Sequence, residues 1–332
     1  MAQDMTANKP GTAIALRLCS IFLFMVMAAL IKSASATVPP PQAVFFRSIF
    51  AFPVIILWLW QQHDLRTGLI PQNFIGHVWR GLFGTTAMAL TFGGLGLLPL
   101  PEVTAIGYAT PMFTVLFAAL LLGERVRIFR LSAVALGLVG VMIVLAPRLS
   151  LEADAVTRTA TIGAIMVLVA SILRALVQIH VRKLVQTEHT AAIVFYFSLT
   201  ATCLSLLTYP LGELTGWTAL DWVTPTWRVA GLMIAAGLIG GVAQIIVTSS
   251  LRFGPASMLA PFDYSSMIFA SIIGWVVFGE LPTSAILTGA ALVIAGGILI
   301  IWRERQLGLD RSKAKATVPP NKPIPLGDTN DR

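Results

Sequence analysis

The sequence predicts an all-α integral membrane protein whose ten transmembrane helices form two inverted five-helix repeats. Three observations predict this fold class: the composition of the chain, the number of its apolar segments, and an internal repeat. Of 332 residues, 56% are hydrophobic and only 11% are charged, with a mean hydropathy of +0.82. A soluble chain carries about 25% charged residues, so this chain has too little charge to cover a water-facing surface. Disordered, collagen-like and disulfide-rich secreted classes are excluded on the same grounds.

Neither the cysteines nor the net charge indicates another class of protein. Cys19 and Cys203 both lie in apolar runs, so no disulfide framework and no cysteine metal site is implied. The net charge of +8 suggests nucleic-acid binding. Much of the basic excess, however, lies in short loops and in the tail after Trp302, where it reads as a topology signal. We therefore exclude nucleic acid as a partner.

Ten segments approach the roughly 20 mostly apolar residues that a membrane helix needs. The first and fifth are short. Proline-rich joints separate several of them. Only three contain a charged residue, one each: Arg47, Arg174 and Asp263. In order, the segments are Leu18–Ile31, Gln42–Trp60, Gly81–Leu100, Val103–Gly123, Leu131–Pro147, Thr159–Ile179, Thr190–Gly212, Val229–Leu251, Phe253–Gly279 and Leu281–Trp302.

The distribution of basic residues predicts the orientation of these helices. With a cytoplasmic N-terminus, 17 Lys and Arg residues face the inside and 4 face the outside, as the positive-inside rule requires. The protein is therefore expected in the cell inner membrane, with both termini in the cytoplasm. Residues 1–12 form a cytoplasmic tail, and the polar tail 303–332 is expected to be disordered.

The first apolar segment has an alternative interpretation. Arg17, the apolar stretch and Ala34-Ser35-Ala36 resemble a cleavable signal peptide. The internal repeat supplies a matching helix later in the chain, which favours retention of this segment as a membrane helix.

The chain repeats itself, with residues 13–147 forming a first unit and residues 159–302 a second. An offset of 156 superposes helices 3–5 on helices 8–10 without a gap, and an offset of 150 relates the first helix pair. Each unit has five helices, and because five is odd, the second unit enters the membrane upside down. Inverted repeats of this kind build transporters with a site near the midplane. The matched pairs include Pro99 with Pro255, Tyr108 with Tyr264, Phe113 with Phe269, Gly123-Glu124 with Gly279-Glu280 and Gly140 with Gly296 at the first offset, and Phe45 with Phe195 and Ser48 with Ser198 at the second.

Two runs in equivalent positions resemble the signature helices of EamA-type drug/metabolite transporters. One extends from Ile106-Gly-Tyr-Ala-Thr-Pro111 to Leu122-Gly-Glu124, and the other from Ala260-Pro-Phe-Asp-Tyr264 to Phe278-Gly-Glu280. Phe46-Arg47-Ser48 at the start of helix 2 is similar to the family too. The resemblance covers about Ala13 to Arg303. It implies a ten-helix inner-membrane carrier with a central cavity that runs without ATP, but it does not indicate the solute.

The three intramembrane charges are candidate site residues, since burying such a charge costs at least about 2.5–3.5 kcal/mol. Asp263 and Arg174 each lie eight residues from the cytoplasmic side, or about 12 Å deep. Equal depth permits an Asp263–Arg174 ion pair facing the cavity. The alternative is that each charge bonds to backbone or water and only fixes packing. Arg47 lies near the outer face, where it either lines the cavity or has a structural role by snorkelling to the interface or pairing with another group.

Uncharged polar residues complete the candidate substrate site. Tyr108 and Tyr264 occupy equivalent repeat positions, and with Tyr196 they are expected to line an aromatic cavity. Gln178 and Gln244 lie at depth, where they bind solute or bond across helices. The alternative for the aromatic residues is packing in the core or against lipid.

The remaining charges near helix ends are expected to be structural. Glu124 and Glu280 should bond loop amides or nearby basic groups, and Lys32 should anchor an outer helix end. Glu102 lies in a tight outer turn and is expected to be solvated.

The predicted function is a secondary transporter that moves a small organic metabolite by alternating access. An acidic and aromatic cavity suits an amino-acid-like, cationic or planar heterocyclic solute, and riboflavin and S-adenosylmethionine are examples carried by similar proteins. No phosphate loop is present and the four histidines lack metal-ligand spacing, so no cofactor is expected. The alternative is an integral-membrane enzyme acting on a lipid-linked substrate. The expected partners are the solute and the lipid bilayer, with homodimer formation left open.

Overall fold

The computed structural model describes residues 10–61, 69–122, 128–148, 155–184, 187–188, 190–253 and 259–306. Within these ranges every regular element is a helix and no β-strand occurs. Glu124, most of the loop between Pro147 and Arg158, and the tails 1–9 and 307–332 lie outside the described residues.

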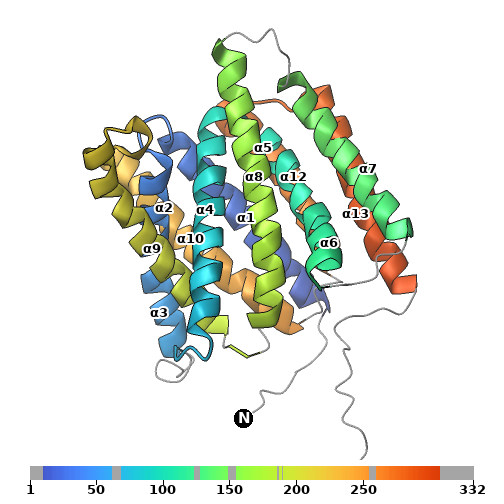
Figure 1. Ribbon diagram of the computed structural model, residues 1–332, viewed down its shortest axis with the longest axis horizontal. Coiled ribbons are helices and arrows are strands. Elements are labelled where there is room, and N and C mark those ends of the chain that lie inside the picture. Colours follow the sequence, from blue (N-terminus) through green and yellow to red (C-terminus); the bar gives the residue numbers. More distant parts are fainter. Residues whose placement is uncertain are drawn as a thin grey trace, which may run out of the picture.

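The helices form an elongated bundle of long, roughly parallel and antiparallel elements (Figure 1). Their bounds are α1 Pro10–Ala34, α2 Pro40–Ile49, α3 Phe52–Gln61, α4 Phe74–Leu97, α5 Leu100–Gly107, α6 Ala109–Leu122, α7 Ile128–Leu145, α8 Ala155–Leu184, α9 Thr190–Thr215, α10 Trp227–Phe253, α12 Ser266–Phe278 and α13 Ser284–Gln306, with short 3-10 turns η1 Ala146–Arg148, η2 Thr218–Leu220 and η3 Ala260–Ser265.

Seven helical stretches in the described chain are long and apolar enough to cross a membrane, and Leu131–Leu145 and Ser284–Leu299 are shorter apolar helices. The prediction of a multi-pass, all-α membrane protein is therefore confirmed. Helix α4 is not among the seven, because His77, Arg80 and several glycines lower its hydropathy. The first segment was predicted to be short, but α1 has 25 residues and runs through Arg17.

Two spans depart from regular α-helix at related positions. The span Leu100–Leu121 breaks between α5 and α6 at Tyr108. Pro111 has no N–H to donate to the carbonyl of Gly107, which accounts for the break. The span Pro261–Phe278 begins with the 3-10 turn η3, which contains Tyr264. Helix α12 then ends at Gly279, whose φ of 68° is a left-handed conformation that glycine adopts without strain.

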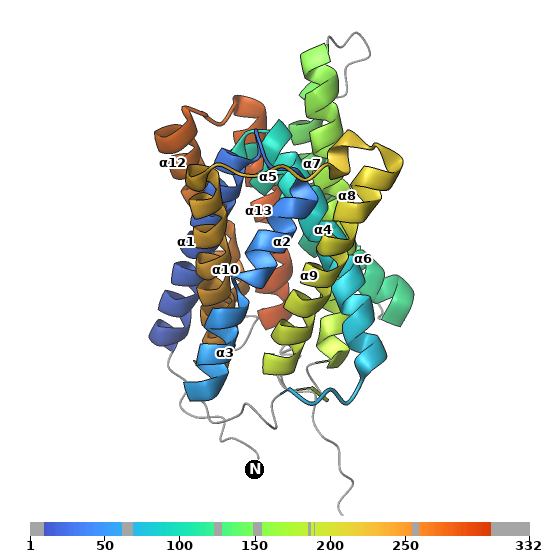
Figure 2. The same cartoon turned by 90° about the vertical axis from the view of Figure 1, so that its left-hand side faces the viewer.

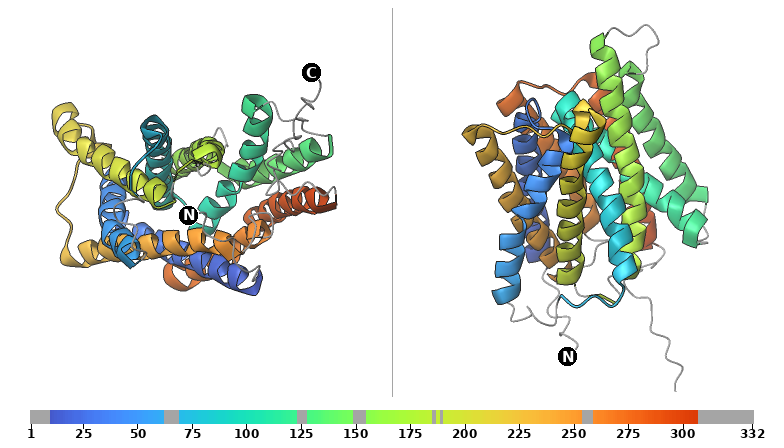
Figure 3. Two further views of the ribbon diagram at one scale, coloured as in Figure 1. Left: turned by 90° about the horizontal axis from the view of Figure 1, so that it is seen from below. Right: turned by 60° about the vertical axis from the view of Figure 1, so that its left-hand side comes forward.

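The most extensive helix contacts join the first half of the sequence to the second. Helix α1 packs along α10, α4 along α8, α7 along α13, and α2 along α9. Viewed from below, α4, α8 and α9 stand on one side of the bundle and α1 and α10 on the other (Figure 3). The α7–α13 contact is closest at Gly140 and Gly289, because a Cβ on either glycine would lie 2.5 Å from the other's carbonyl oxygen.

The start of α1 and the end of α13 lie at the same end of the bundle (Figures 1 and 2). We call this the terminal end and the opposite one the far end. The far end holds the end of α1, the turn between α4 and α5, and the end of α12.

Candidate functional site

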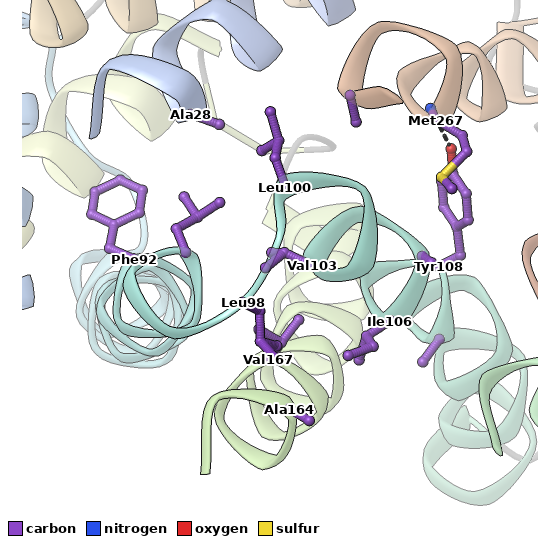
Figure 4. Packing of buried hydrophobic residues seen from close by; sticks show 14 of the residues in the cluster. Ala28, Phe92, Leu98, Leu100, Val103, Ile106, Tyr108, Ala164, Val167 and Met267 are labelled. Carbon is purple, nitrogen blue, oxygen red and sulfur yellow. Dashed lines mark hydrogen bonds between the residues drawn. The ribbon is translucent and has the colours of Figure 1, made fainter. Parts of the chain in front are cut away.

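Tyr108 and Tyr264 meet where the two irregular spans cross. Their rings are 5.3 Å apart, edge to face. The Tyr108 hydroxyl lies 3.0 Å from the Tyr264 carbonyl and 2.7 Å from the Ser266 hydroxyl, and it accepts the amide hydrogen of Met267 at 2.9 Å. Figure 4 shows Tyr108 reaching from its own helix to Met267. The structure thus brings the repeat-related tyrosines together, and Tyr108 joins the two spans.

Tyr264 is held from its other side by α13. A Cβ built on Gly297 would lie 1.5 Å from the Tyr264 hydroxyl oxygen, so only glycine leaves room for the phenol. The ring is therefore fixed between Tyr108 and Gly297, with part of its surface accessible. An aromatic face held in this way can stack on a planar group.

Asp263 pairs with Arg17 rather than with Arg174. The Nε and Nη2 atoms of Arg17 donate to the two carboxylate oxygens, each at 2.6 Å. The Arg17 side chain is 19% exposed and the Asp263 side chain 42% exposed. The Asp263–Arg174 pair suggested by equal depth is not formed, because depth does not determine which way a side chain points around its helix.

Arg174 instead lies beside the break in the α5–α6 span. Its Nη2 donates to the Ser171 hydroxyl at 3.3 Å and would lie 3.6 Å from a Cβ on Gly107. Its Nε has no hydrogen-bond partner in the described structure. Arg174 therefore keeps an unused Nε donor, while its Nη2 lies beside the discontinuous helix.

A second ion pair links α1 to the connection between α12 and α13 at the far end. Lys32 Nζ lies 3.0 Å from Glu280 and donates to the carbonyls of Leu95 and Leu98 at 3.1 and 2.5 Å. Glu280 also accepts the backbone amide of Leu100 at 2.9 Å. The prediction that Glu280 bonds loop amides and a basic group is confirmed, and Lys32 is bonded inside the bundle at its helix end.

Glu102 was predicted to be solvated, and that prediction is wrong. It lies in the first turn of α5 and is 1% exposed. The tight turn before α5 places it beneath neighbouring helices instead of on the surface.

Arg47 is inside the bundle and does not snorkel to the interface. It is 5% exposed, and its guanidinium lies 5.7 Å from the centroid of the Phe197 ring. Gln244 lines a narrow void next to it. Arg80, one residue before the predicted segment Gly81–Leu100, lies 4.3 Å from the same ring. Arg17 and Arg80 were missed because helices α1 and α4 begin before the apolar runs that marked them.

Tyr196 and Gln178 are away from the paired tyrosines. The Tyr196 hydroxyl donates to the carbonyl of Leu69 at 3.0 Å, and its ring packs on His77. Gln178 is exposed and accepts a hydrogen bond from Thr114 at 3.0 Å. The expected cavity of several tyrosines is thus reduced to the Tyr108–Tyr264 pair.

Glu188 fastens the α8–α9 connection to the start of α4. It accepts the backbone amides of Gln72 and Asn73 at 2.8 and 2.5 Å and lies 3.3 Å from His77. Burial would raise the pKa of the Glu188 carboxyl. The two amides and His77 outweigh that effect, so the net pKa lies below its ordinary value.

The bundle defines the class of protein. Charged side chains buried among apolar spans, next to helices that break partway across, are features of a membrane transporter. The chain belongs to the EamA-like transporter family, whose model matches residues 11–146 and 161–302.

Similar proteins include transporters of several different solutes. A pseudopaline exporter of Pseudomonas aeruginosa is 30% identical over 291 residues, which cover 87% of this chain and 93% of that one. An S-adenosylmethionine uptake transporter of Rickettsia prowazekii is 24% identical, covering 79% and 81% of the two chains. A riboflavin transporter of Rhizobium johnstonii is 28% identical, covering 80% and 82%. All are named as transporters, so the enzyme alternative gains no support.

A solved crystal structure shares the fold. It is 21% identical to this chain, with a TM-score of 0.60, and the match covers 90% of this chain and 99% of that one.

Proposed function

We propose that this protein is a secondary carrier that moves a small organic metabolite across the cell inner membrane by alternating access. The Arg17–Asp263 pair carries the proposal. The pair lies within the bundle. Its carboxylate residue, Asp263, directly precedes Tyr264, and the Asp263 side chain is 42% exposed. A charge that is held inside a membrane bundle and is still reachable can meet a solute or exchange a proton.

The proposed architecture is ten spans in two inverted five-helix repeats. The break at Tyr108 and the irregular turn around Tyr264 fall on positions that the 156-residue offset relates. An even number of crossings agrees with the start of α1 and the end of α13 lying at one end of the bundle. The family model also matches the chain twice, once in each half.

In the proposed orientation the terminal end is cytoplasmic, on the strength of the 17 to 4 basic count. A test replaces Cys19 and Cys203, the two native cysteines, and introduces single cysteines at exposed positions. An impermeant thiol reagent added outside should label Thr224→Cys and leave Gln72→Cys unlabelled. The opposite pattern would overturn the orientation.

The proposed solute is amino-acid-like, cationic or planar heterocyclic. Asp263 would meet a cationic group or exchange a proton, and Tyr108 with Tyr264 would offer a ring face. The solutes named for the relatives carry charged or planar heterocyclic groups of this type. The proposed set is completed by Arg47 and, as more peripheral members, by Arg174, Gln178, Gln244 and Tyr196.

The test is uptake by proteoliposomes that contain only this protein. A competition panel of amino acids, S-adenosylmethionine and riboflavin is run with and without a proton gradient. Asp263→Asn should insert normally and lose most uptake or its pH dependence, whereas Asp221→Asn, at an exposed loop position, should transport normally. Full uptake by Asp263→Asn across pH, at matched protein amounts, would refute a transport role for this carboxylate.

The partner arginine separates charge balance from solute binding. If Asp263 only neutralises Arg17, the double variant Asp263→Asn with Arg17→Gln should recover uptake. If the carboxylate serves the solute, the double variant should remain inactive. Absence of uptake of any panel solute by the unmodified protein, in either gradient, would contradict the proposed function itself.

A further inference from the structure

Two arginines from separate helices converge on one aromatic ring. Arg47 belongs to α2, Arg80 to α4 and Phe197 to α9. The guanidinium carbons of Arg47 and Arg80 lie 5.7 and 4.3 Å from the Phe197 ring centroid. Since both distances end at one point, the two guanidinium carbons are at most about 10 Å apart. The protein thus concentrates two positive charges inside a bundle of low polarity.

These two cations lack a compensating anion in the described parts of the chain. The ion pairs found there involve Arg17, Lys32 and His77, and neither Arg47 nor Arg80 forms one. Arg47 Nε and Arg80 Nε and Nη1 are buried without a hydrogen-bond partner. The face of an aromatic ring attracts a cation, but it does not accept hydrogen bonds from the N–H groups that lie in the plane of the guanidinium. The arrangement therefore leaves both charge and donors unsatisfied.

A glycine makes room for the Phe197 ring at the centre of this cluster, and another lies in van der Waals range of Arg47. A Cβ on Gly84 would lie 2.8 Å from the Phe197 ring, and one on Gly240 would lie 3.5 Å from Arg47 Nε. The narrow void beside Arg47 is lined by Phe197, Ser198 and Gln244 among others. It is too small for a solute group in this arrangement, so binding requires α2, α4 and α9 to part slightly.

We propose that Arg47 and Arg80 together bind a carboxylate group of the transported solute. A guanidinium presents two parallel N–H donors that match the two oxygens of a carboxylate. A carboxylate carbon lies about 4 Å from each guanidinium carbon in such a pair, so one group can bridge two arginines separated by up to about 8 Å. The bound of about 10 Å on the Arg47–Arg80 separation includes this range, and the bridge forms only if the solute-bound state holds the two guanidinium carbons within about 8 Å of each other. The inference rests on the proposed transport function and adds an anionic requirement to it.

This site would make the protein favour solutes that carry a carboxylate. Amino-acid-like metabolites have this group, whereas a neutral heterocycle lacks it.

The first experiment measures anion binding by the purified protein without reference to transport. Thermal unfolding in detergent is followed in sodium acetate, in sodium chloride of equal ionic strength, and with added acetamide. Acetate should stabilise the protein beyond chloride and acetamide. Arg47→Gln and Arg80→Gln should each abolish that increment, and Arg228→Gln, an exposed arginine near the start of α10, should retain it.

Stability without acetate distinguishes binding from packing. Removal of one of two like charges should leave the unfolding temperature of Arg80→Gln unchanged or higher. If Arg80→Gln instead unfolds earlier and keeps the acetate increment, the pair is a packing feature and the proposal is overturned. Arg47→Lys provides a second variant that keeps charge, and it should retain part of the increment even if Arg47→Gln fails to fold.

A transport readout then separates this inference from the proposed function. For any solute found to be taken up, Arg80→Gln should raise the KM of the carboxylate form about tenfold or more, with no such rise for its carboxamide. Uptake with equal KM changes for both forms would refute the carboxylate site and leave the carrier function intact. Acetate binding without uptake of any solute would support the carboxylate site and contradict the carrier function. Stabilisation by phosphatidylglycerol but not by acetate would assign the pair to lipid and overturn the proposal.

Discussion

Loss of the Glu280 carboxylate should open the far end and destabilise the protein. In Glu280→Gln, Lys32 keeps its hydrogen bonds to the carbonyls of Leu95 and Leu98, at 3.1 and 2.5 Å, but loses the ion pair with the Glu280 carboxylate at 3.0 Å. Breaking a fully buried pair costs about 3–5 kcal/mol, and an exposed pair is worth about 0–1 kcal/mol. The side chains here are 12% and 21% exposed, so we expect a loss of about 2–3 kcal/mol.

A double-mutant cycle measures the pair itself. Unfolding free energies in mixed micelles are determined for Glu280→Gln, Lys32→Gln and the double variant, with Asp221→Asn as the exposed control. We expect a coupling energy of about 1–2 kcal/mol, since the carbonyl contacts of Lys32 are lost in both variants that lack it. A coupling below about 0.5 kcal/mol would refute the view that this ion pair closes the far end.

The same closure predicts chemical accessibility. Ile31 lies beside Lys32 and is 1% exposed. In a background without native cysteines, Ile31→Cys should react slowly with an impermeant thiol reagent and faster when Glu280→Gln is added. Equal rates would show that the far end is held shut by packing alone.

Three further outcomes follow from the described contacts. Tyr108→Phe should lower the unfolding free energy by about 1–2 kcal/mol, because the hydroxyl accepts one amide and reaches two oxygens across the span crossing; an unchanged value would mean that the crossing relies on ring packing. Gly297→Ala should lower the free energy of unfolding by about 1–3 kcal/mol, because the added methyl group displaces Tyr264. The control Gly231→Ala, whose Cβ meets nothing within 4 Å, should stabilise α10 by about 0.5–1 kcal/mol. Equal effects of the two variants would exclude the clash with Tyr264. Glu188 has a lowered pKa in the folded state. Its contribution to the free energy of unfolding should therefore be fully present above its unfolded pKa and disappear as pH falls through the lower folded pKa. Thermal unfolding of Glu188→Gln should lack that acid-dependent loss of stability, and pH profiles identical to those of the unmodified protein would contradict the assignment.

The membrane class was predictable because composition and apolar length depend on residue content alone. The bounds of α1 were not. A count of apolar residues places the start of the first span at Leu18, directly after Arg17. In the structure, Asp263, 246 residues away, neutralises the Arg17 charge, and α1 extends back to Pro10. A one-dimensional pattern contains no information about such a partner.

The site was predictable in depth and not in direction. Asp263 and Arg174 were placed at similar depth, yet the structure pairs Asp263 with Arg17. Which residues face one another depends on the rotation of each helix about its axis, and packing against neighbouring helices sets that rotation. The internal repeat did carry three-dimensional information, because it identified Tyr108 and Tyr264 as a pair before their contact was known.

The crossing of contacts between the two halves of the sequence has a consequence for biosynthesis. Helices α1, α2, α4 and α7 each have their main packing partner in α8, α9, α10 or α13, which are translated later. When the first half leaves the ribosome, its helices can enter the bilayer one by one, but their buried faces must wait in contact with lipid. Assembly should therefore be largely post-translational, and a chain cut near Pro147 should yield stable protein only when both pieces are made in the same cell.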